Sequence, residues 1–443
     1  MNRRHFIQAL SASLSAPLVA AARRPPNIIH FLADDVGYDD IGCYGAQGIA
    51  TPNLDRFARA GMRFTDFYAP ASVCTPSRAS ILTGRYSCRM KPIQNILTPG
   101  ARGITAGRET TIATLLRKAG YRTGIIGKWH LGDVPESLPT NNGFDEYYGI
   151  PYPNDMGPEM RKDSPPIPVY RDLKQVEVPA DLPNLPDKFT AAALRFIEEH
   201  RQRPFFLHFA NIETHTPWFV PGRFRGKSPV GAYGDAVQCM DWCFGQIVDK
   251  VRGLGLERDT LLVFSSDNGP LAAESPSAKS LKAVYGQYAD PRPSEVHLLR
   301  GYKGTAQWEG GPRVPAIFRW PGVIPEAREC REVTGGMDLF TTFADLAGVP
   351  VPGDRPMDGK SLMPLLRAER GAGPPHAVYF SYAGARLGGV RKARWKLSLP
   401  PGRQPELYDL EKDLRERSDV SASNPEVLKE MLALAIEGRR IAE

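Results

Sequence analysis

Two groups of oxygen-bearing side chains follow strand-like apolar runs. Asp34 and Asp35 come directly after one run, and Asp267 and Asn268 follow another. In α/β sheets, ligands bind beyond the carboxyl ends of the strands. Adjacent carboxylates there repel each other and lose hydration unless a cation neutralises them. Because an all-oxygen set suits Ca²⁺ or Mg²⁺ and suits zinc poorly, we expect a hard-cation site, with ordinary loop turns as the alternative.

A cysteine stands where a helix is expected to begin. Pro76 and the small residues after it are typical of a first helical turn, so Cys74 should lie at or just before the helix N-terminus. Helix N-termini favour anions, and Arg78 lies about one turn further on. The segment therefore indicates an activated cysteine or an anion site, with a structural cysteine as the alternative.

Alternating strand-like and helix-like segments must position these side chains, and the alternation predicts an α/β domain. Strands are expected at residues 27–33, 121–127, 204–210 and 260–265, and helices at 51–61, 110–119, 187–202, 235–252 and 338–347. We expect Thr51 to cap the first of these helices. The turn-rich stretches 151–186 and 271–300 are expected to be loops, and loops of that length are usually functional or mobile.

The pattern changes towards the C-terminus. Short strands are expected at 377–382, 388–390 and 395–399, followed by a helix from Pro425 to about Ile441. This is the pattern of a small α+β subdomain. We therefore divide the chain into residues 1–22 as a signal peptide, 23–365 as the catalytic domain and 366–443 as the C-terminal subdomain.

Composition excludes several classes of protein. The chain has 443 residues, of which 24% are charged and 42% hydrophobic, so wholesale disorder is excluded. Its 42 Gly and 41 Pro show no three-residue period, which excludes collagen, and six Cys are too few for a disulfide scaffold. We expect Cys239 and Cys243, four residues apart on one helix, to lie in the core. The net charge of +7 comes without a basic run that contains aromatic residues, so no nucleic acid partner is expected.

The N-terminus has the pattern of an export signal. Arg3 and Arg4 precede an apolar run, and small residues end it at Ala22. The two arginines followed by His5 and Phe6 fit a twin-arginine signal, with an ordinary secretory signal as the alternative. The run is too short and too polar for a stable membrane anchor. We therefore expect recognition by export machinery and a periplasmic or secreted protein.

Blocks distributed over almost the whole chain resemble the type I sulfatase family of the alkaline phosphatase superfamily, and its arylsulfatase A-like and N-acetylgalactosamine-6-sulfatase-like members most closely. The strongest is Cys-x-Pro-Ser-Arg-x-x-x-Leu-Thr-Gly at residues 74–84. The others are Asp34-Asp35-Val36-Gly37, Gly127-Lys128-Trp129-His130-Leu131-Gly132, Thr214-His215-Thr216-Pro217, Ser266-Asp267-Asn268-Gly269, Lys303-Gly304-Thr305 with Glu309-Gly310-Gly311-Pro312-Arg313-Val314-Pro315, and Glu406-Leu407-Tyr408-Asp409-Leu410. Their order and number make the resemblance specific.

The resemblance implies an enzyme that hydrolyses sulfate esters. Cys74 would be converted after translation to formylglycine, whose hydrated aldehyde attacks sulfur and forms a covalent sulfo-enzyme. The residues implied to bind the metal, Ca²⁺ in preference to Mg²⁺, are Asp34, Asp35, Asp267, Asn268 and the modified residue 74.

The resemblance also implies roles for five further side chains. Arg78 would steady the nucleophile and the metal carboxylates. Lys128 and Lys303 would hold sulfate oxygens. His130 would be the base on the second hydroxyl of the hydrated aldehyde, and His215, alone or together with Lys303, would be the acid for the leaving group.

The implied fold is a large domain with a mixed, mostly parallel sheet flanked by helices, plus a small C-terminal subdomain with a short antiparallel sheet. The implied substrate is a sulfated carbohydrate or a small aryl sulfate, and nothing in the two long loops names a sugar. A formylglycine-generating or anaerobic sulfatase-maturing enzyme would be a partner. The alternatives are a formylglycine-dependent phosphodiesterase or phosphonate monoester hydrolase, and an inactive protein that binds sulfated glycans.

Overall fold

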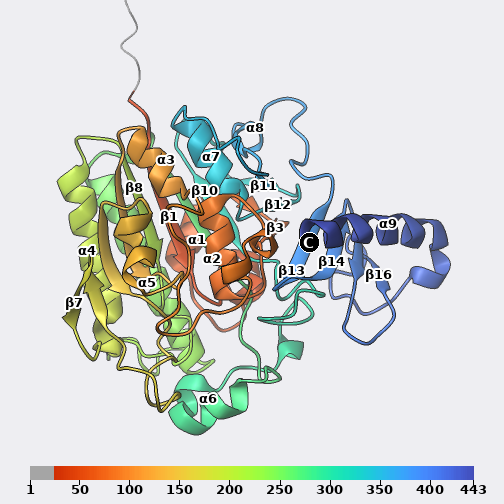
Figure 1. The fold of residues 1–443 in the computed structure, drawn as a ribbon, viewed down its shortest axis with the longest axis horizontal. Helices are drawn as coiled ribbons and strands as arrows, with labels where there is room; N and C mark the ends of the chain where they lie inside the picture. The colour runs from red at the N-terminus through yellow and green to blue at the C-terminus, as the bar shows by residue number, and fades with distance from the viewer. Residues whose placement is uncertain (1–23) are drawn as a thin grey trace, which may run out of the picture.

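A ten-stranded sheet forms the centre of the computed structural model, which describes residues 24–443 (Figure 1). The strand order is β11-β2-β10-β9-β1-β8-β4-β5-β6-β7. The middle strands β9, β1, β8, β4 and β5 are mutually parallel, whereas β10, β6 and β7 run antiparallel to their neighbours. The parallel strands are β1 (Asn27–Ala33), β4 (Arg122–Lys128), β5 (Glu146–Ile150), β8 (Phe205–Ala210) and β9 (Thr260–Ser266). The predicted mixed, mostly parallel sheet is confirmed.

Short strands that the sequence analysis did not predict complete the edges of this sheet. They are β2 (Met62–Phe64), β6 (Val169–Arg171), β7 (Lys174–Glu177), β10 (Ala316–Arg319) and β11 (Arg328–Cys330). A separate two-stranded sheet joins β3 (Phe67–Tyr68) to β12 (Thr334–Gly335). The predicted loop 151–186 therefore contains a hairpin, and the predicted loop 271–300 contains the helix α6 (Ala278–Tyr285).

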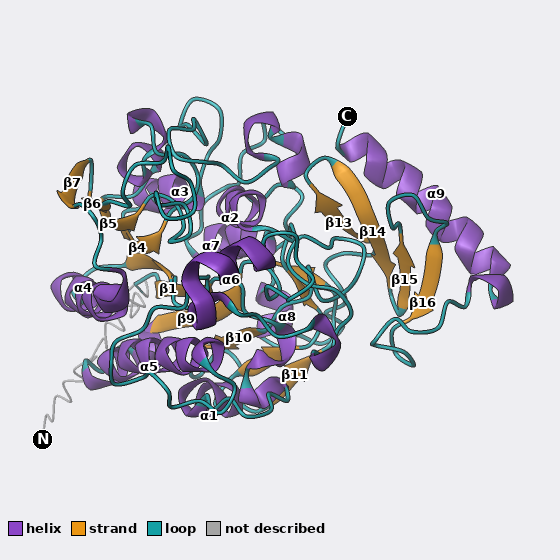
Figure 2. Ribbon diagram, turned by 90° about the horizontal axis from the view of Figure 1, so that it is seen from below, coloured by secondary structure: helices purple, strands orange, loops and turns teal. Residues whose placement is uncertain are grey.

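Helices cover both faces of the large sheet, because successive side chains of a strand point to opposite faces. On β1, Ile29 and Phe31 join one hydrophobic core, whereas Ile28 and Leu32 join the other. Helices α1 (Pro52–Arg59), α4 (Leu185–His200) and α5 (Ala232–Gly253) cover the first face. Helices α2 (Cys74–Thr83), α3 (Ile112–Lys118), α7 (Asp338–Leu346) and α8 (Met363–Leu366) cover the second. Figure 2 shows α1 and α5 on one side of the sheet and α2 and α3 on the other.

A second, four-stranded antiparallel sheet lies at one end of the molecule, drawn in blue in Figure 1. Its strands are β13 (Tyr379–Ala383), β14 (Arg386–Lys392), β15 (Trp395–Ser398) and β16 (Glu406–Asp409), and α9 (Pro425–Ile441) packs on it. The predicted C-terminal sheet and helix are confirmed. The boundary at residue 365 stays a prediction.

Local details differ from the expectations in one place and agree in another. The Thr51 hydroxyl does not cap α1; it accepts a hydrogen bond from the Gly42 N–H at 2.8 Å and donates to Asp55. Cys74 is the first residue of α2, as expected.

The predicted signal peptide lies outside the described residues. Within residues 24–443, no helix has the length and apolar character needed to cross a membrane.

Candidate active site

The two acidic groups meet at the carboxyl ends of two neighbouring strands in the middle of the central sheet. β1 and β9 are parallel neighbours, and Ala33 pairs with Ser266 at their ends. Asp34, Asp35, Asp267 and Asn268 follow these two residues directly and are all buried. The backbone N–H of Asp35 donates to Asp267 Oδ1 at 3.1 Å, and Asn268 Nδ2 donates to Asp35 Oδ1 at 2.7 Å. The strand register therefore places all four side chains in one cluster.

Cys74 lies against this cluster and is only 1% exposed. Its Sγ is 3.6 Å from Asp34 Oδ1 and 3.8 Å from Asp35 Oδ1. Burial raises the pKa of the thiol, and this effect outweighs the opposing charges of Lys128 and Lys303. The unmodified side chain is therefore a protonated thiol at neutral pH. The expected alternative of an activated cysteine does not fit these surroundings, since the thiolate would face carboxylates in a buried position.

Three cationic side chains are directed at the acidic residues. Lys128 Nζ, at the end of β4, is 2.6 Å from Asp34 Oδ2, and Lys303 Nζ is 2.7 Å from Asp35 Oδ2. Arg78, one turn along α2 from Cys74, donates from Nε to an Asp267 carboxylate oxygen at 2.8 Å. It also donates from Nη1 to the carbonyl of Lys128 at 3.0 Å. Two hydrogen bonds to groups on different segments hold the arginine plane in one orientation.

The charges of these groups follow from their pairing. Burial raises the pKa of Asp34, but Lys128 and Arg78 outweigh it and hold that pKa well below its usual range. Burial and the charge of Asp34 raise the pKa of Asp267 to about 7 against the influence of Arg78. Burial lowers the pKa of Lys303, but Asp35 and its other anionic neighbours raise it well above its ordinary value, so the ammonium stays charged.

His130 follows β4 and has a backbone φ of 58°, in the left-handed region that non-glycine residues rarely adopt. Its Nε2 lies 3.0 Å from the carbonyl oxygen of Leu97 and donates to it. The buried Nδ1 has no hydrogen-bond partner among the described residues. Burial, with Lys128 and Arg78, holds the pKa of His130 well below its ordinary value. The ring is therefore neutral at neutral pH and presents an unshared electron pair at Nδ1, as a general base requires.

His215 lies in the loop that follows β8 and approaches the acidic cluster from the other side. Its Nε2 is 3.8 Å from Asp35 Oδ2. Burial, Lys303 and Lys128 lower its pKa. Its Nδ1 faces the carbonyl of Thr216 at 2.7 Å and the side-chain oxygen of Asn154 at 3.0 Å. In each histidine, one ring nitrogen therefore faces a carbonyl oxygen: Nε2 in His130 and Nδ1 in His215. The other ring nitrogen points away from that carbonyl.

The cluster fits a hard divalent cation. Ligand atoms of Asp34, Asp35, Cys74 and His215 lie within 4.8 Å of one another. Asn268 Oδ1 is buried and has no hydrogen-bond partner in the part of the chain that the structure describes. A buried carbonyl oxygen of this kind is costly unless something binds it. A cation coordinated by carboxylate and amide oxygens would satisfy the Asn268 carbonyl oxygen.

All ten residues expected from the sequence are thus brought to one buried edge of the sheet, and no chemistry was expected of Asn154. This residue contacts the His215 ring from the loop 151–186. The sequence indicated that loop but not that residue. Cys239 and Cys243 are fully buried, which confirms the prediction that they belong to the core. All six cysteines are free thiols.

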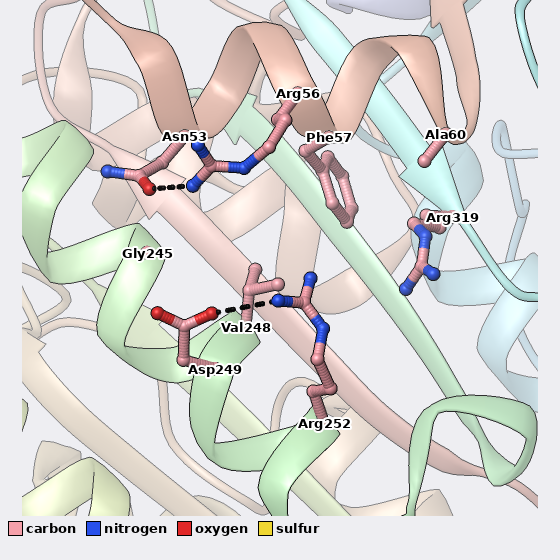
Figure 3. Close-up of a pocket in the computed structure, with 9 residues that line it drawn as sticks. All are labelled: Asn53, Arg56, Phe57, Ala60, Gly245, Val248, Asp249, Arg252 and Arg319. Atoms are coloured by element: carbon pink, nitrogen blue, oxygen red, sulfur yellow. Dashed lines mark hydrogen bonds and ion pairs between the residues drawn. The ribbon is translucent and has the colours of Figure 1, made fainter.

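A separate hollow of about 130 Å³ lies between α1 and α5 (Figure 3). Two of its arginines are paired within their own helices: Arg56 donates to Asn53 at 2.5 Å, and Arg252 donates to Asp249 at 3.3 Å. It contains none of the residues that surround Cys74. The chemistry of the chain is therefore concentrated at the sheet edge and not in this hollow.

Comparison with protein families gives two matches. The sulfatase family model matches residues 26–349, and a model described as the C-terminal part of N-sulphoglucosamine sulphohydrolase matches residues 303–438. The first match spans well over half of the chain. It includes the strands and loops that carry Cys74 and the acidic cluster.

Individual relatives agree with this assignment. Arylsulfatase A of Homo sapiens is 36% identical over 98% of this chain and 90% of its own length, and N-acetylgalactosamine-6-sulfatase of Rattus norvegicus is 38% identical over 86% and 73%. Among solved structures, that of Ps i-CgsB has a TM-score of 0.81 and 29% identity and covers 95% of this chain and 94% of its own. A phosphonate monoester hydrolase of Agrobacterium radiobacter shares the fold at 19% identity, with a TM-score of 0.66 and coverage of 94% and 96%. The chain therefore belongs to the sulfatase family, whose members hydrolyse sulfate esters.

Proposed function

We propose that this sulfatase removes sulfate from a sulfated carbohydrate or a small aryl sulfate, with formylglycine derived from Cys74 as its nucleophile. One observation carries the proposal. The Sγ of Cys74 lies within 4 Å of two carboxylates, and Lys128 and Lys303 each reach one of those same carboxylates. A sulfate ester with its sulfur in front of residue 74 would thus meet metal-ligand oxygens and two ammonium groups together.

The surroundings of Cys74 favour the modified residue over the thiol. Burial keeps the thiol protonated. Attack by the Cys74 Sγ on the sulfate ester would also leave a thiosulfate adduct with no easy route of breakdown. The hydrated aldehyde of formylglycine supplies a hydroxyl that attacks sulfur and a second hydroxyl whose deprotonation releases sulfate.

The cation in this proposal is Ca²⁺ in preference to Mg²⁺. Asp34, Asp35, Asp267 and Asn268 would hold it together with an oxygen of the modified residue 74. The unpartnered Asn268 Oδ1 supports this set, as does the oxygen-only chemistry of the side chains. A bound Ca²⁺ would supply positive charge that favours the deprotonated nucleophile and stabilises the sulfate group.

Each cationic side chain has a role that its position supports. Lys128 and Lys303, already directed at Asp34 and Asp35, would hold the sulfate oxygens on which charge accumulates in the transition state. Arg78, fixed by Asp267 and by the Lys128 carbonyl, would steady the nucleophile from the helix side. These are binding and orienting roles that need no proton transfer.

Proton transfers fall to the two histidines and Lys303. His130 would take the proton of the second hydroxyl at Nδ1, which is buried and unpartnered among residues 24–443. The proton for the leaving oxygen would come from His215, from Lys303 or from both. The charged state of the Lys303 ammonium supports its part in this step.

A carbohydrate substrate is supported by a related structure, that of Ps i-CgsB in complex with a neocarrahexaose, at 28% identity and a TM-score of 0.80. The loops 151–186 and 271–300 are the candidates for substrate choice. Both reach the His215 loop: Asn154 contacts the His215 ring, and the backbone N–H of Trp218 donates to the Tyr288 carbonyl at 2.8 Å. They therefore border the position that the leaving group would take.

The proposal includes the setting of the enzyme. Residues 1–22 would direct twin-arginine export to the periplasm or the medium, and residues 366–443 would form a subdomain attached to the catalytic domain 23–365. A formylglycine-generating or anaerobic sulfatase-maturing enzyme would act on Cys74. A fluorescent fusion to residues 1–22 should leave the cytoplasm, and substitution of Lys for Arg3 and Arg4 should prevent it if the route is twin-arginine.

One side-by-side assay tests the reaction. Protein co-produced with a maturing enzyme should turn over 4-nitrophenyl sulfate faster than bis(4-nitrophenyl) phosphate, and the peptide containing residue 74 should be about 18 Da lighter than its cysteine form. A preference for the diester would instead support the phosphodiesterase alternative. An unmodified Cys74 in the native host would support the inactive glycan-binding alternative. High activity of Cys74→Ala would rule out the mechanism.

A further inference from the structure

Asn154, in the loop after β5, forms hydrogen bonds to the His215 segment through both the nitrogen and the oxygen of its side-chain amide. The side chain is buried, and the residue is 5% exposed. Its Nδ2 donates to the carbonyl oxygens of His215 at 3.2 Å and of Pro217 at 2.9 Å, and its Oδ1 lies 3.0 Å from Nδ1 of the His215 ring. One side chain therefore contacts both the ring and the backbone that carries it.

The orientation of this amide is determined by its partners. A backbone carbonyl only accepts hydrogen bonds, so the –NH₂ group of Asn154 must face the carbonyls of His215 and Pro217. Its Oδ1 must then face Nδ1 of the ring. The Thr216 carbonyl, 2.7 Å from the same nitrogen, is also an acceptor.

Because both groups facing Nδ1 are acceptors, Nδ1 must carry the hydrogen. In a neutral imidazole the unshared electron pair is then on Nε2. This nitrogen is 3.8 Å from Asp35 Oδ2 and so faces the acidic cluster. The hydrogen bonds of Asn154 and Thr216 thus select one of the two tautomers and direct its free electron pair at the reaction centre.

We propose that Asn154 is a positioning residue that fixes both the orientation and the Nδ1–H tautomer of His215. This inference rests on the proposed function for its catalytic meaning. Its consequence is that His215 exchanges protons with the reacting groups only at Nε2. Any proton that His215 gives to the leaving oxygen must first be taken up at that nitrogen, while Nδ1–H stays bonded to Asn154.

The tautomer can be read without turnover, by long-range ¹H–¹⁵N NMR on the full chain labelled in its histidines, with His215→Gln to assign the signal. The wild type should show the hydrogen of His215 on Nδ1. Asn154→Ala leaves only the Thr216 carbonyl opposite Nδ1, so it should reduce the share of the Nδ1–H tautomer and lower kcat about tenfold or more with little change in KM. Wild-type protein with the hydrogen on Nε2, or an Asn154→Ala variant with unchanged tautomer and kcat, would overturn the inference.

Two further variants keep the test decisive. Asn154→Asp retains an acceptor opposite Nδ1 and should keep the wild-type tautomer even if Asn154→Ala does not fold; loss of that tautomer would contradict the inference. Asn27→Ala is the matched control, because Asn27 is a buried amide (1% exposed) bonded to Thr260 at the opposite end of β1, and it should leave tautomer and kcat as in the wild type. Absence of sulfatase activity would count against the proposed function and leave the tautomer result standing.

Discussion

The ammonium of Lys396 lies 2.7 Å from Oε1 of Glu309, and both side chains are completely buried. Lys396 belongs to β15 of the C-terminal sheet, whereas Glu309 belongs to the loop of the large domain that carries Lys303. Glu309 also accepts from the Tyr68 hydroxyl at 2.6 Å. Burial raises its pKa, but Lys396 and Arg313 outweigh burial and lower that pKa to about 2. An ionised pair therefore joins the two parts of the chain.

Removing the cation of this pair should destabilise the protein strongly. Lys396→Met leaves the charge of Glu309 buried with fewer partners, and we expect the free energy of unfolding to fall by about 3 kcal/mol or more. Urea unfolding measures it. The control is Lys392→Met on β14, whose partner Glu430 is exposed, with an expected cost of about 1 kcal/mol or less. Equal losses in the two variants would contradict the prediction.

Removal of the metal should abolish turnover reversibly. After chelation, activity with 4-nitrophenyl sulfate should return with Ca²⁺ more fully than with Mg²⁺, because Ca²⁺ accepts many protein oxygens whereas Mg²⁺ keeps several of its waters. Asn268→Ala should weaken Ca²⁺ binding by about tenfold or more, since it removes one ligand oxygen. Calorimetric titration of the chelated protein measures this. Full activity of thoroughly chelated enzyme would contradict the site.

Loss of one sulfate-directed ammonium should act on the chemical step. Lys128→Met should lower kcat by about 100-fold or more, because the proposed function sets this ammonium against charge that grows in the transition state. Steady-state kinetics give kcat and KM separately. Lys188→Met is the control: its ammonium is partly exposed on α4 and pairs with Glu177, so kcat should not change. A change confined to KM would assign Lys128 to substrate binding alone.

Stability should fall below about pH 6.5 because of a buried histidine on β1. Burial, and less strongly Arg78, lower the pKa of His30 from 6.5 to about 3. The unfolded ring takes up a proton near pH 6.5, whereas the folded ring does not until about pH 3. Stability is therefore present above pH 6.5 and is lost as the pH falls towards 3, by about 1.4 kcal/mol per pH unit.

A paired substitution tests this slope. The His30 ring lies 2.9 Å from the Ser265 hydroxyl, so His30→Leu with Ser265→Ala replaces both partners by apolar groups. Urea unfolding between pH 6.5 and 5 should then show a slope shallower by about 1.4 kcal/mol per pH unit, and Ser265→Ala alone should keep the original slope. An unchanged slope in the double variant would assign the pH dependence to other groups.

Alanine substitutions at two glycines should distinguish the cost of a steric clash from the cost of backbone strain. Gly127, directly before Lys128, has a φ of 110°, and a Cβ there would lie 1.9 Å from the Ala210 carbonyl oxygen. Gly120 also has a positive φ, of 86°, but a Cβ there meets no atom of the described structure within 4 Å. Gly120→Ala should cost about 1 kcal/mol, whereas Gly127→Ala should cost more and also lower kcat by displacing Lys128. Similar thermal shifts and equal kcat would contradict the prediction.

Much of the fold could be predicted because its signals are local. The long apolar runs at β1 and β9 and the periodic helices α5 and α9 appear in the sequence close to their observed bounds. β2 and β11 have three residues each, too few for a two-residue period to be recognised. Their pairing is set by the strands beside them. The same holds for the hairpin in the predicted loop 151–186, which forms as an extension of the sheet from β5.

The candidate site could be predicted where function requires a residue type at a fixed spacing, as in Cys74 to Arg78 or Asp34 to Asp35. Asn154 could not, because its importance comes from a contact with His215, 61 residues away. Lys396, 87 residues from its partner Glu309, shows the same limit. An isolated polar residue in a sequence has no period and no motif that tells which distant group it will meet.

The burial of Cys74 sets an order of events in the life of each chain. Every residue of α2 is buried, so a maturing enzyme cannot bind this segment once the helix has packed in the folded protein. In the proposed function, the aldehyde would then be installed on a nascent or still unfolded chain. A twin-arginine route carries folded cargo, so maturation, folding and export would follow in that sequence. A molecule that folds first would keep an unmodified Cys74 and would stay inactive, because a maturing enzyme could no longer reach it.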